Sequence, residues 1–239
     1  MNTREKIGDY ETLAAIIMNS LTSFVEDESF STIYSYAFKG NINLISIDMP
    51  HLEKISGEGF VNCDALVSAK FASATQIYSQ AFRVDRALEE VYFPNVTVTS
   101  NEAFAYCSKI TEINMPVLRS IGSSSFSYCT ALEKVYIPSI NDIGSYVFNN
   151  CTSLKKIDLN NVSSIGSNVF TYSGLETVIL RNTSTVCSLA SYNSFSGLNS
   201  LSIYVPDNLV DSYKEATNWS TFADRIKPLS ELPAEEEES

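Results

Sequence analysis

Apolar residues recur with a fixed period along most of the chain. A phenylalanine returns every 22 residues, with a final interval of 25, at Phe38, Phe60, Phe82, Phe104, Phe126, Phe148, Phe170 and Phe195. Further columns keep this register. Ile stands five residues before most of the phenylalanines, Cys three residues after several of them, and Leu or Ile six residues after them. Several columns in register predict a solenoid in which each repeat forms one coil.

Each repeat also contains a short segment in which polar and apolar residues alternate. These segments are ISIDMP, LEEVYFP, ITEINMP, LEKVYIP, LKKIDLN, LETVIL and LSIYVP. Alternation sends neighbouring side chains to opposite faces, so each segment predicts a strand that stacks in parallel on the next, about 4.8 Å away. Proline at the end of several segments cannot donate to the ladder and ends the strand. Ile-Gly pairs such as Ile121-Gly122 predict a turn, followed by a tight or short helical turn that returns the phenylalanine to the core.

The repeat unit reads A-F-x-x-C-x-x-L-x-x-I-x-I-P-x-x-x-x-I-G-x-x, and its closest copy is FSYCTALEKVYIPSINDIGSYV at 126–147. This pattern resembles the BspA-like leucine-rich repeats of bacterial, protist and phage proteins. The resemblance implies a leucine-rich repeat solenoid, α/β or mostly β, with a parallel sheet of about eight coils. The chain departs from the pattern at Ala72 (for Pro), Asp85 (for Cys), Thr99 (for Ile, with Val98 filling in by a one-residue slip) and before Leu175, where the coil is one residue short.

A solenoid leaves an open apolar face at each end, and both ends of this chain predict helical caps. Leu13, Ile16, Ile17, Leu21 and Phe24 fall at helical spacing after a possible N-cap at Asp9, and Asp207 is placed to cap a helix that turns Leu209, Val210 and Tyr213 inward, with Trp219, Phe222 and Ile226 continuing the lid. We therefore divide the chain into an N-terminal helical cap (1–29), a solenoid (30–206), a C-terminal helical cap (207–230) and an acidic disordered tail (231–239).

The charge balance restricts the partners. The chain has 16 basic and 28 acidic residues and a net charge of −12, which argues against nucleic acid and anionic membranes because both require a cationic surface. No apolar run approaches the roughly 20 residues of a membrane span, so we expect no membrane insertion. The first 20 residues lack a compact apolar stretch followed by a cleavage site. The chain is then either not secreted by the usual route or has lost a leader.

No constellation of residues predicts catalysis, a metal site or a cofactor. His51 and Cys63 could pair as base and nucleophile, but Cys63 belongs to an inward column, where a thiol acts as a small buried hydrophobe. The cysteines recur at the repeat period, which predicts a line of free thiols and neither a tetrahedral site nor disulfides. Glu89 and Glu90 are adjacent in a strand and face opposite ways, so they cannot act together on one sugar.

The outward strand positions remain as the candidate surface. They are polar with tyrosine at intervals, and the candidate contact residues are Glu90, Tyr92, Glu112, Asn114, Lys134, Tyr136, Lys156, Asp158 and Tyr204. Tyrosine is common at recognition sites, although it is also an ordinary strand surface residue. A second row, Tyr106, Tyr128 and Tyr172, is interpreted as edge packing.

We therefore predict a non-enzymatic binding or adhesion module for a protein or glycan on a host or cell surface. The family resemblance implies an extracellular, cell-surface or virion location. The alternative function is a structural protein of a phage or prophage virion, associated with the tail or in contact with a receptor.

Overall fold

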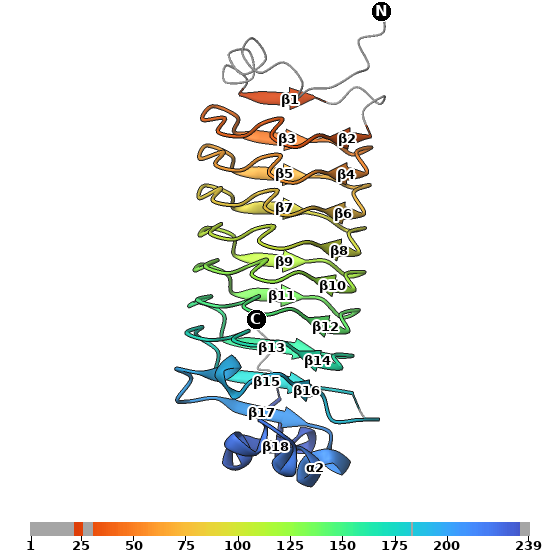
Figure 1. The fold of residues 1–239 in the computed structure, drawn as a ribbon, viewed down its shortest axis with the longest axis vertical. Helices are drawn as coiled ribbons and strands as arrows, with labels where there is room; N and C mark the ends of the chain where they lie inside the picture. Colours follow the sequence, from red (N-terminus) through yellow and green to blue (C-terminus); the bar gives the residue numbers. More distant parts are fainter. Residues whose placement is uncertain (1–21, 26–30, 183, 235–239) are drawn as a thin grey trace, which may run out of the picture.

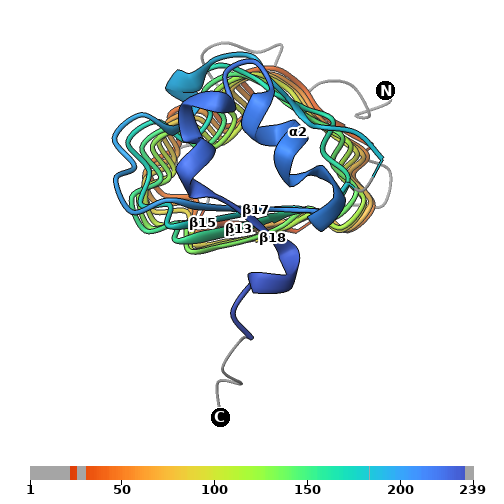
Figure 2. The same cartoon turned by 90° about the horizontal axis from the view of Figure 1, so that it is seen from below.

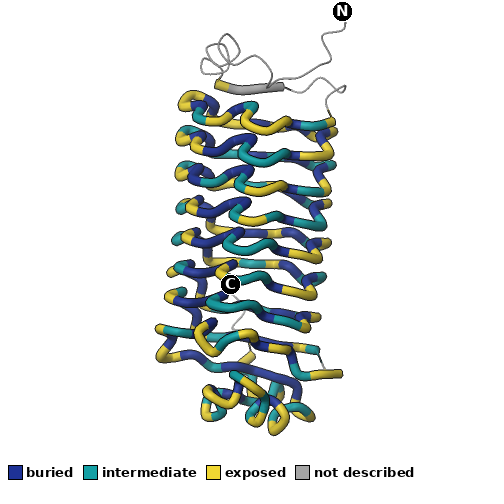
Figure 3. Tube along the Cα trace, viewed as in Figure 1, coloured by how far each residue is buried: buried dark blue, intermediate teal, exposed yellow. Residues whose placement is uncertain are grey.

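A computed structural model describes residues 22–25, 31–182 and 184–234. Within these residues the chain winds into stacked coils that form an elongated rod (Figure 1). Buried and exposed stretches alternate in the same way along successive coils (Figure 3). The predicted solenoid is therefore confirmed, and each phenylalanine of the 22-residue period lies in its core.

One side of the rod carries the longer strands, which we call the front sheet (Figure 1). All its pairings are parallel and in register, in ladders β1-β3-β5-β7, β9-β11 and β13-β15-β17-β18. The strands are β1 (Ser23–Val25), β3 (Ser46–Asp48), β5 (Ser68–Lys70), β7 (Glu90–Tyr92), β9 (Glu112–Asn114), β11 (Lys134–Tyr136), β13 (Lys156–Leu159), β15 (Thr177–Leu180), β17 (Ser202–Val205) and β18 (Ile226–Pro228).

A second parallel sheet of eight two-residue strands runs along the rod beside the front sheet (Figure 1). Its strands are β2 (Thr32–Ile33), β4 (Lys54–Ile55), β6 (Gln76–Ile77), β8 (Val98–Thr99), β10 (Ser120–Ile121), β12 (Asp142–Ile143), β14 (Ser164–Ile165) and β16 (Ser188–Leu189). The predicted slip at Val98 is wrong, because Thr99 pairs in register with Ile77 and Ile121 and is buried. Thr99 can occupy the isoleucine position because its hydroxyl lies 3.4 Å from that of Ser125.

The turn around each phenylalanine forms a third ladder. In the Phe60 coil, the N–H groups of Glu58, Phe60 and Asn62 donate to carbonyls of the next coil at 2.8–3.1 Å. Glu58 and Asn62 have φ of 57° and 60°, and the equivalent residues of every coil from Phe60 to Phe170 also have positive φ. The residues with positive φ stand two positions before and two positions after the phenylalanine. In this backbone conformation, alternate N–H groups of the turn point at the neighbouring coil. The predicted tight turn therefore joins adjacent coils as the strands do.

The phenylalanine column is a continuous stack of buried rings. From Phe38 to Phe195 successive ring centroids are 4.9–5.8 Å apart, with planes within 11° of parallel. Beyond Phe195 the rings of Phe222 and Trp219 continue the contact. Because every ring packs on its neighbours along the rod, the stack couples each coil to the next.

The N-terminal helix predicted over Asp9 to Phe24 lies almost entirely outside the described residues. Its last residue does not: Phe24 is in β1, paired in register with Ile47 of β3. The helical prediction is wrong at this position, because pairing with the neighbouring strand overrides a local helical spacing.

The C-terminal segment is part helix and part strand. After the 3₁₀ turn η1 (Tyr192–Phe195), it contains η2 (Asp207–Leu209), the short helix α2 (Val210–Glu215), η3 (Ser220–Arg225), β18 and η4 (Leu229–Glu231). Viewed along the rod, α2 lies across its end (Figure 2). The prediction that Asp207 is a helix N-cap is wrong. Its carboxylate accepts the N–H of Ser230, so it joins η2 to the chain after β18.

Candidate binding surface

The centre of the front sheet presents two tyrosines on strands separated by one coil. Tyr92 on β7 and Tyr136 on β11 are 51% and 56% exposed. Asn114 on β9 lies between them, is exposed, and is in register with Tyr136. Two coil spacings of about 4.8 Å place the tyrosine backbones roughly 10 Å apart. The strands thus hold two aromatic side chains on either side of one amide.

The charged residues of this face are partly engaged with each other. Lys70 lies 2.8 Å from Glu90, and the Ser68 hydroxyl also donates to Glu90. The hydrogen bond from Lys70 is the main reason that the pKa of Glu90 is lowered. Asp158 accepts a bidentate hydrogen bond from Arg181 at 2.7–2.9 Å.

Glu112 and Lys134 are exposed and stand in register on neighbouring strands, while Lys156 and Asp158 are half-buried. The face is therefore of mixed charge. Such a surface is suited to polar partners and does not form a continuous cationic or anionic patch.

The inclusion of Tyr204 in the predicted surface is wrong. Tyr204 is only 5% exposed, and Ile179 at the preceding rung is fully buried. The strand β18 pairs with β17, which brings Lys227 to 5.7 Å from the Tyr204 ring, and the chain then leaves the rod on the front-sheet side (Figure 2). The C-terminal segment therefore covers this end of the face, which the alternation of a single strand could not reveal.

Two tyrosines of the second row, Tyr106 and Tyr128, form a partly exposed stack. The rings of Tyr106 and Tyr128 are parallel, with centroids 4.7 Å apart, and the Arg83 guanidinium lies 5.4 Å from the Tyr106 ring. Both tyrosines are 39% exposed, and Tyr172 is still more open. Tyr106 and Tyr128 thus pack as predicted for the row, although both remain partly exposed.

Further exposed tyrosines lie in the turns and were not singled out from the sequence: Tyr34, Tyr36, Tyr78, Tyr146 and Tyr192. Their exposure could have been predicted from the sequence, because each of these tyrosines stands outside the apolar columns of the repeat. Exposed tyrosine is thus distributed around the rod, and on the front sheet Tyr92 and Tyr136 have the exposed amide of Asn114 between their open rings.

The cysteines are buried and free. Burial raises the pKa of every thiol, to about 12 for Cys129 and Cys187. A thiol that stays protonated at neutral pH is a poor nucleophile and a poor metal ligand. Cys63 donates its Sγ–H to the Phe38 carbonyl, whereas His51 is exposed on a turn, so the sequence alternative of a Cys63–His51 pair gains no support.

Across the described residues, no group of three or more His, Cys, Asp or Glu side chains is placed to hold a metal ion. Within the same part of the chain no helix is long and apolar enough to cross a membrane.

Comparison with known proteins gives a repeat-family match over most of the chain. The model of the BspA type leucine rich repeat region matches in six copies, over residues 15–129 and 97–221. No curated protein matches the sequence.

Among solved structures, the rod is similar to a leucine-rich repeat protein from Bacteroides ovatus ATCC 8483, with a TM-score of 0.56 and 21% identity over 78% of this chain. The match spans 60% of the length of that structure. The pneumococcal vaccine antigen PcpA (TM-score 0.43, 13% identity) is covered over 81% of its length by 87% of this chain. A leucine rich cell surface protein from Faecalibacterium prausnitzii A2-165 (TM-score 0.39, 15% identity) is covered over 80% by 90% of this chain. At these identities the first likeness supports the fold.

Proposed function

Since the chain belongs to the BspA-type leucine-rich repeat family, we propose that it is a non-enzymatic binding module that acts at a host or cell surface. Its partner is a protein or a glycan, and its contact surface is the centre of the front sheet, from β7 to β13. This surface comprises Glu90, Tyr92, Glu112, Asn114, Lys134, Tyr136, Lys156 and Asp158.

The observation that carries the proposal is the pair of open tyrosines, Tyr92 and Tyr136, with Asn114 between them. Tyrosine offers a large contact area and a hydroxyl at low entropic cost. The repeat already fixes the backbone that carries each ring, so binding costs little further backbone entropy. The absence of a large cationic patch on this face favours a polar protein or a neutral glycan over a polyanion.

The experiment uses wild-type protein to capture a ligand by pull-down or on a glycan array, followed by titration of the double variant Tyr92→Ser, Tyr136→Ser. We expect binding to weaken by about 1–4 kcal/mol with little change in Tm. A matched control, Tyr78→Ser with Tyr192→Ser, removes two exposed tyrosines from the turns and should bind as wild type does. Unchanged affinity in a folded Tyr92/Tyr136 variant would move the contact to another surface.

The alternative of a phage or prophage virion component has no observation on the described residues in its favour.

A further inference from the structure

One position of the cysteine column carries a carboxylic acid. Elsewhere in the column, the Sγ of each cysteine donates to the phenylalanine carbonyl of the preceding coil, at 3.0–3.3 Å. These pairs are Cys63 to Phe38, Cys107 to Phe82, Cys129 to Phe104 and Cys151 to Phe126. By the same register, Asp85 stands where a cysteine would donate to the Phe60 carbonyl.

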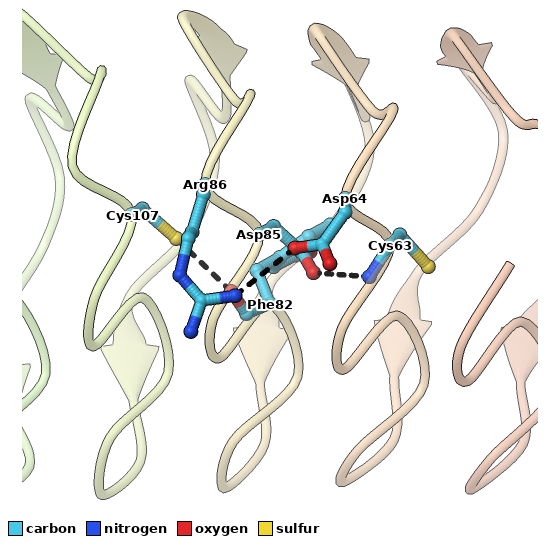
Figure 4. Close-up of polar contacts among 6 residues, drawn as sticks. All are labelled: Cys63, Asp64, Phe82, Asp85, Arg86 and Cys107. Carbon is cyan, nitrogen blue, oxygen red and sulfur yellow. Dashed lines mark hydrogen bonds and ion pairs between the residues drawn. The ribbon is translucent and has the colours of Figure 1, made fainter. Parts of the chain in front are cut away.

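Asp85 is fully buried, and only one of its oxygens has a partner. Its Oδ1 accepts the N–H of Cys63 at 2.7 Å (Figure 4). Its Oδ2 is buried and has no hydrogen-bond partner. At this one position, where the register of the repeat calls for a cysteine, the column therefore contains a buried carboxyl oxygen without a partner.

The arginines of the neighbouring turn pair with carboxylates other than that of Asp85. Asp64 of the preceding coil and Arg86 pair with each other at 3.3 Å, and Arg83 pairs with Glu102 at 2.8 Å. The titratable groups beside Asp85 in the column are the thiols of Cys63 and Cys107, whose pKa values are raised. Burial raises the pKa of Asp85 well above its ordinary value, and the negative charge of Asp64 acts in the same direction.

We propose that Asp85 is a neutral carboxylic acid in the folded protein, with its Oδ2–H donating to the Phe60 carbonyl in place of a thiol. The contact between the Phe60 and Phe82 coils, which we call the joint, then depends on the protonation of Asp85. Ionisation of Asp85 would remove the donor and leave a buried charge between the two coils.

The direction of the pH effect follows from proton binding. In the unfolded chain an aspartic acid ionises near pH 3.9, so above that pH the folded state holds a proton that the unfolded state has lost. Stability from this joint is full below about pH 3.9 and decreases as the pH rises toward the raised pKa of Asp85. The joint is thus tightest under acidic conditions.

The test compares wild type with Asp85→Asn, since the Asn amide keeps the acceptor for Cys63 and supplies a permanent donor for Phe60. We expect the two proteins to melt at nearly the same temperature near pH 4, and the variant to melt several degrees higher as the pH rises toward about 8. The control Glu112→Gln removes one exposed carboxylate from the front sheet and should show no such divergence. A difference in Tm that is constant with pH, or a variant less stable throughout, would overturn the proposal.

A second measurement addresses the protonation state directly. Infrared difference spectra between wild type and Asp85→Asn at neutral pH should contain the carbonyl band of a protonated acid, and a carboxylate band in its place would refute a neutral Asp85. If the Asn variant does not fold, Asp85→Cys restores the column and takes its place in both measurements.

Discussion

The Sγ–H of Cys129 donates to the carbonyl oxygen of Phe104 at 3.3 Å, and both side chains are fully buried. The cysteine column is therefore tied to the phenylalanine column of the preceding coil, and each thiol proton has a structural role. Its small size and its weak S–H donor explain why cysteine suits this position.

The burial of Cys129 predicts a loss of stability at alkaline pH. The folded-state pKa of Cys129 is raised to about 12, whereas an unfolded thiol ionises near pH 8.5. The folded state thus binds more protons above that pH, and stability falls as the pH rises from about 8.5 toward 12. We expect Tm to decrease over this range and Ellman's reagent to react with the thiols only after unfolding. Rapid labelling of the native protein would contradict the burial of the column.

The two columns should differ in energetic weight. Phe126→Ala removes a ring that stacks on both Phe104 and Phe148 and leaves a cavity, so we expect it to cost about 3–5 kcal/mol. Cys129→Ala removes one sulfur and one weak hydrogen bond, and about 1–2 kcal/mol should be lost. Urea unfolding of the two variants measures both values. Equal costs would mean that the ring stack does not dominate the core.

The repeat was predictable because one register governs every coil. The phenylalanine spacing placed each core ring, and the alternation of segments such as LEKVYIP placed each front strand. Thr99 and Asp85 were harder to predict, because a polar residue stays in an apolar column only where another coil supplies a hydrogen-bond partner. Ser125 is that partner for Thr99, and the Cys63 N–H is that partner for Asp85. The prediction that Tyr204 is exposed was wrong for a similar reason, because the chain beyond the repeat, including Lys227, packs over its ring.

The shortened coil after Phe170 depends on a glycine. A Cβ at Gly174 would lie 2.0 Å from the carbonyl oxygen of Thr152 in the preceding coil, and backbone atoms cannot yield as a flexible side chain can. We expect Gly174→Ala to cost about 3 kcal/mol or more. The control Gly40→Ala meets no atom within 4 Å and suffers only from its positive φ, for which about 1 kcal/mol is expected. Thermal unfolding of both variants separates the close approach from the general effect of adding a methyl group.

The C-terminal segment should protect the end of the rod. Trp219 and Phe222 pack on Phe195, the last ring of the stack, and β18 pairs with the edge of β17. Deleting residues 207–239 would expose these rings and leave β17 as an open parallel edge, which is a template for pairing with another chain. We expect the truncated protein to melt at a lower temperature and to form oligomers or aggregates by size-exclusion chromatography with light scattering. Deleting only 235–239 should leave the oligomeric state and the Tm unchanged, because the packed residues remain. A monomeric 1–206 protein that melts as the full chain does would show that the segment is not a cap.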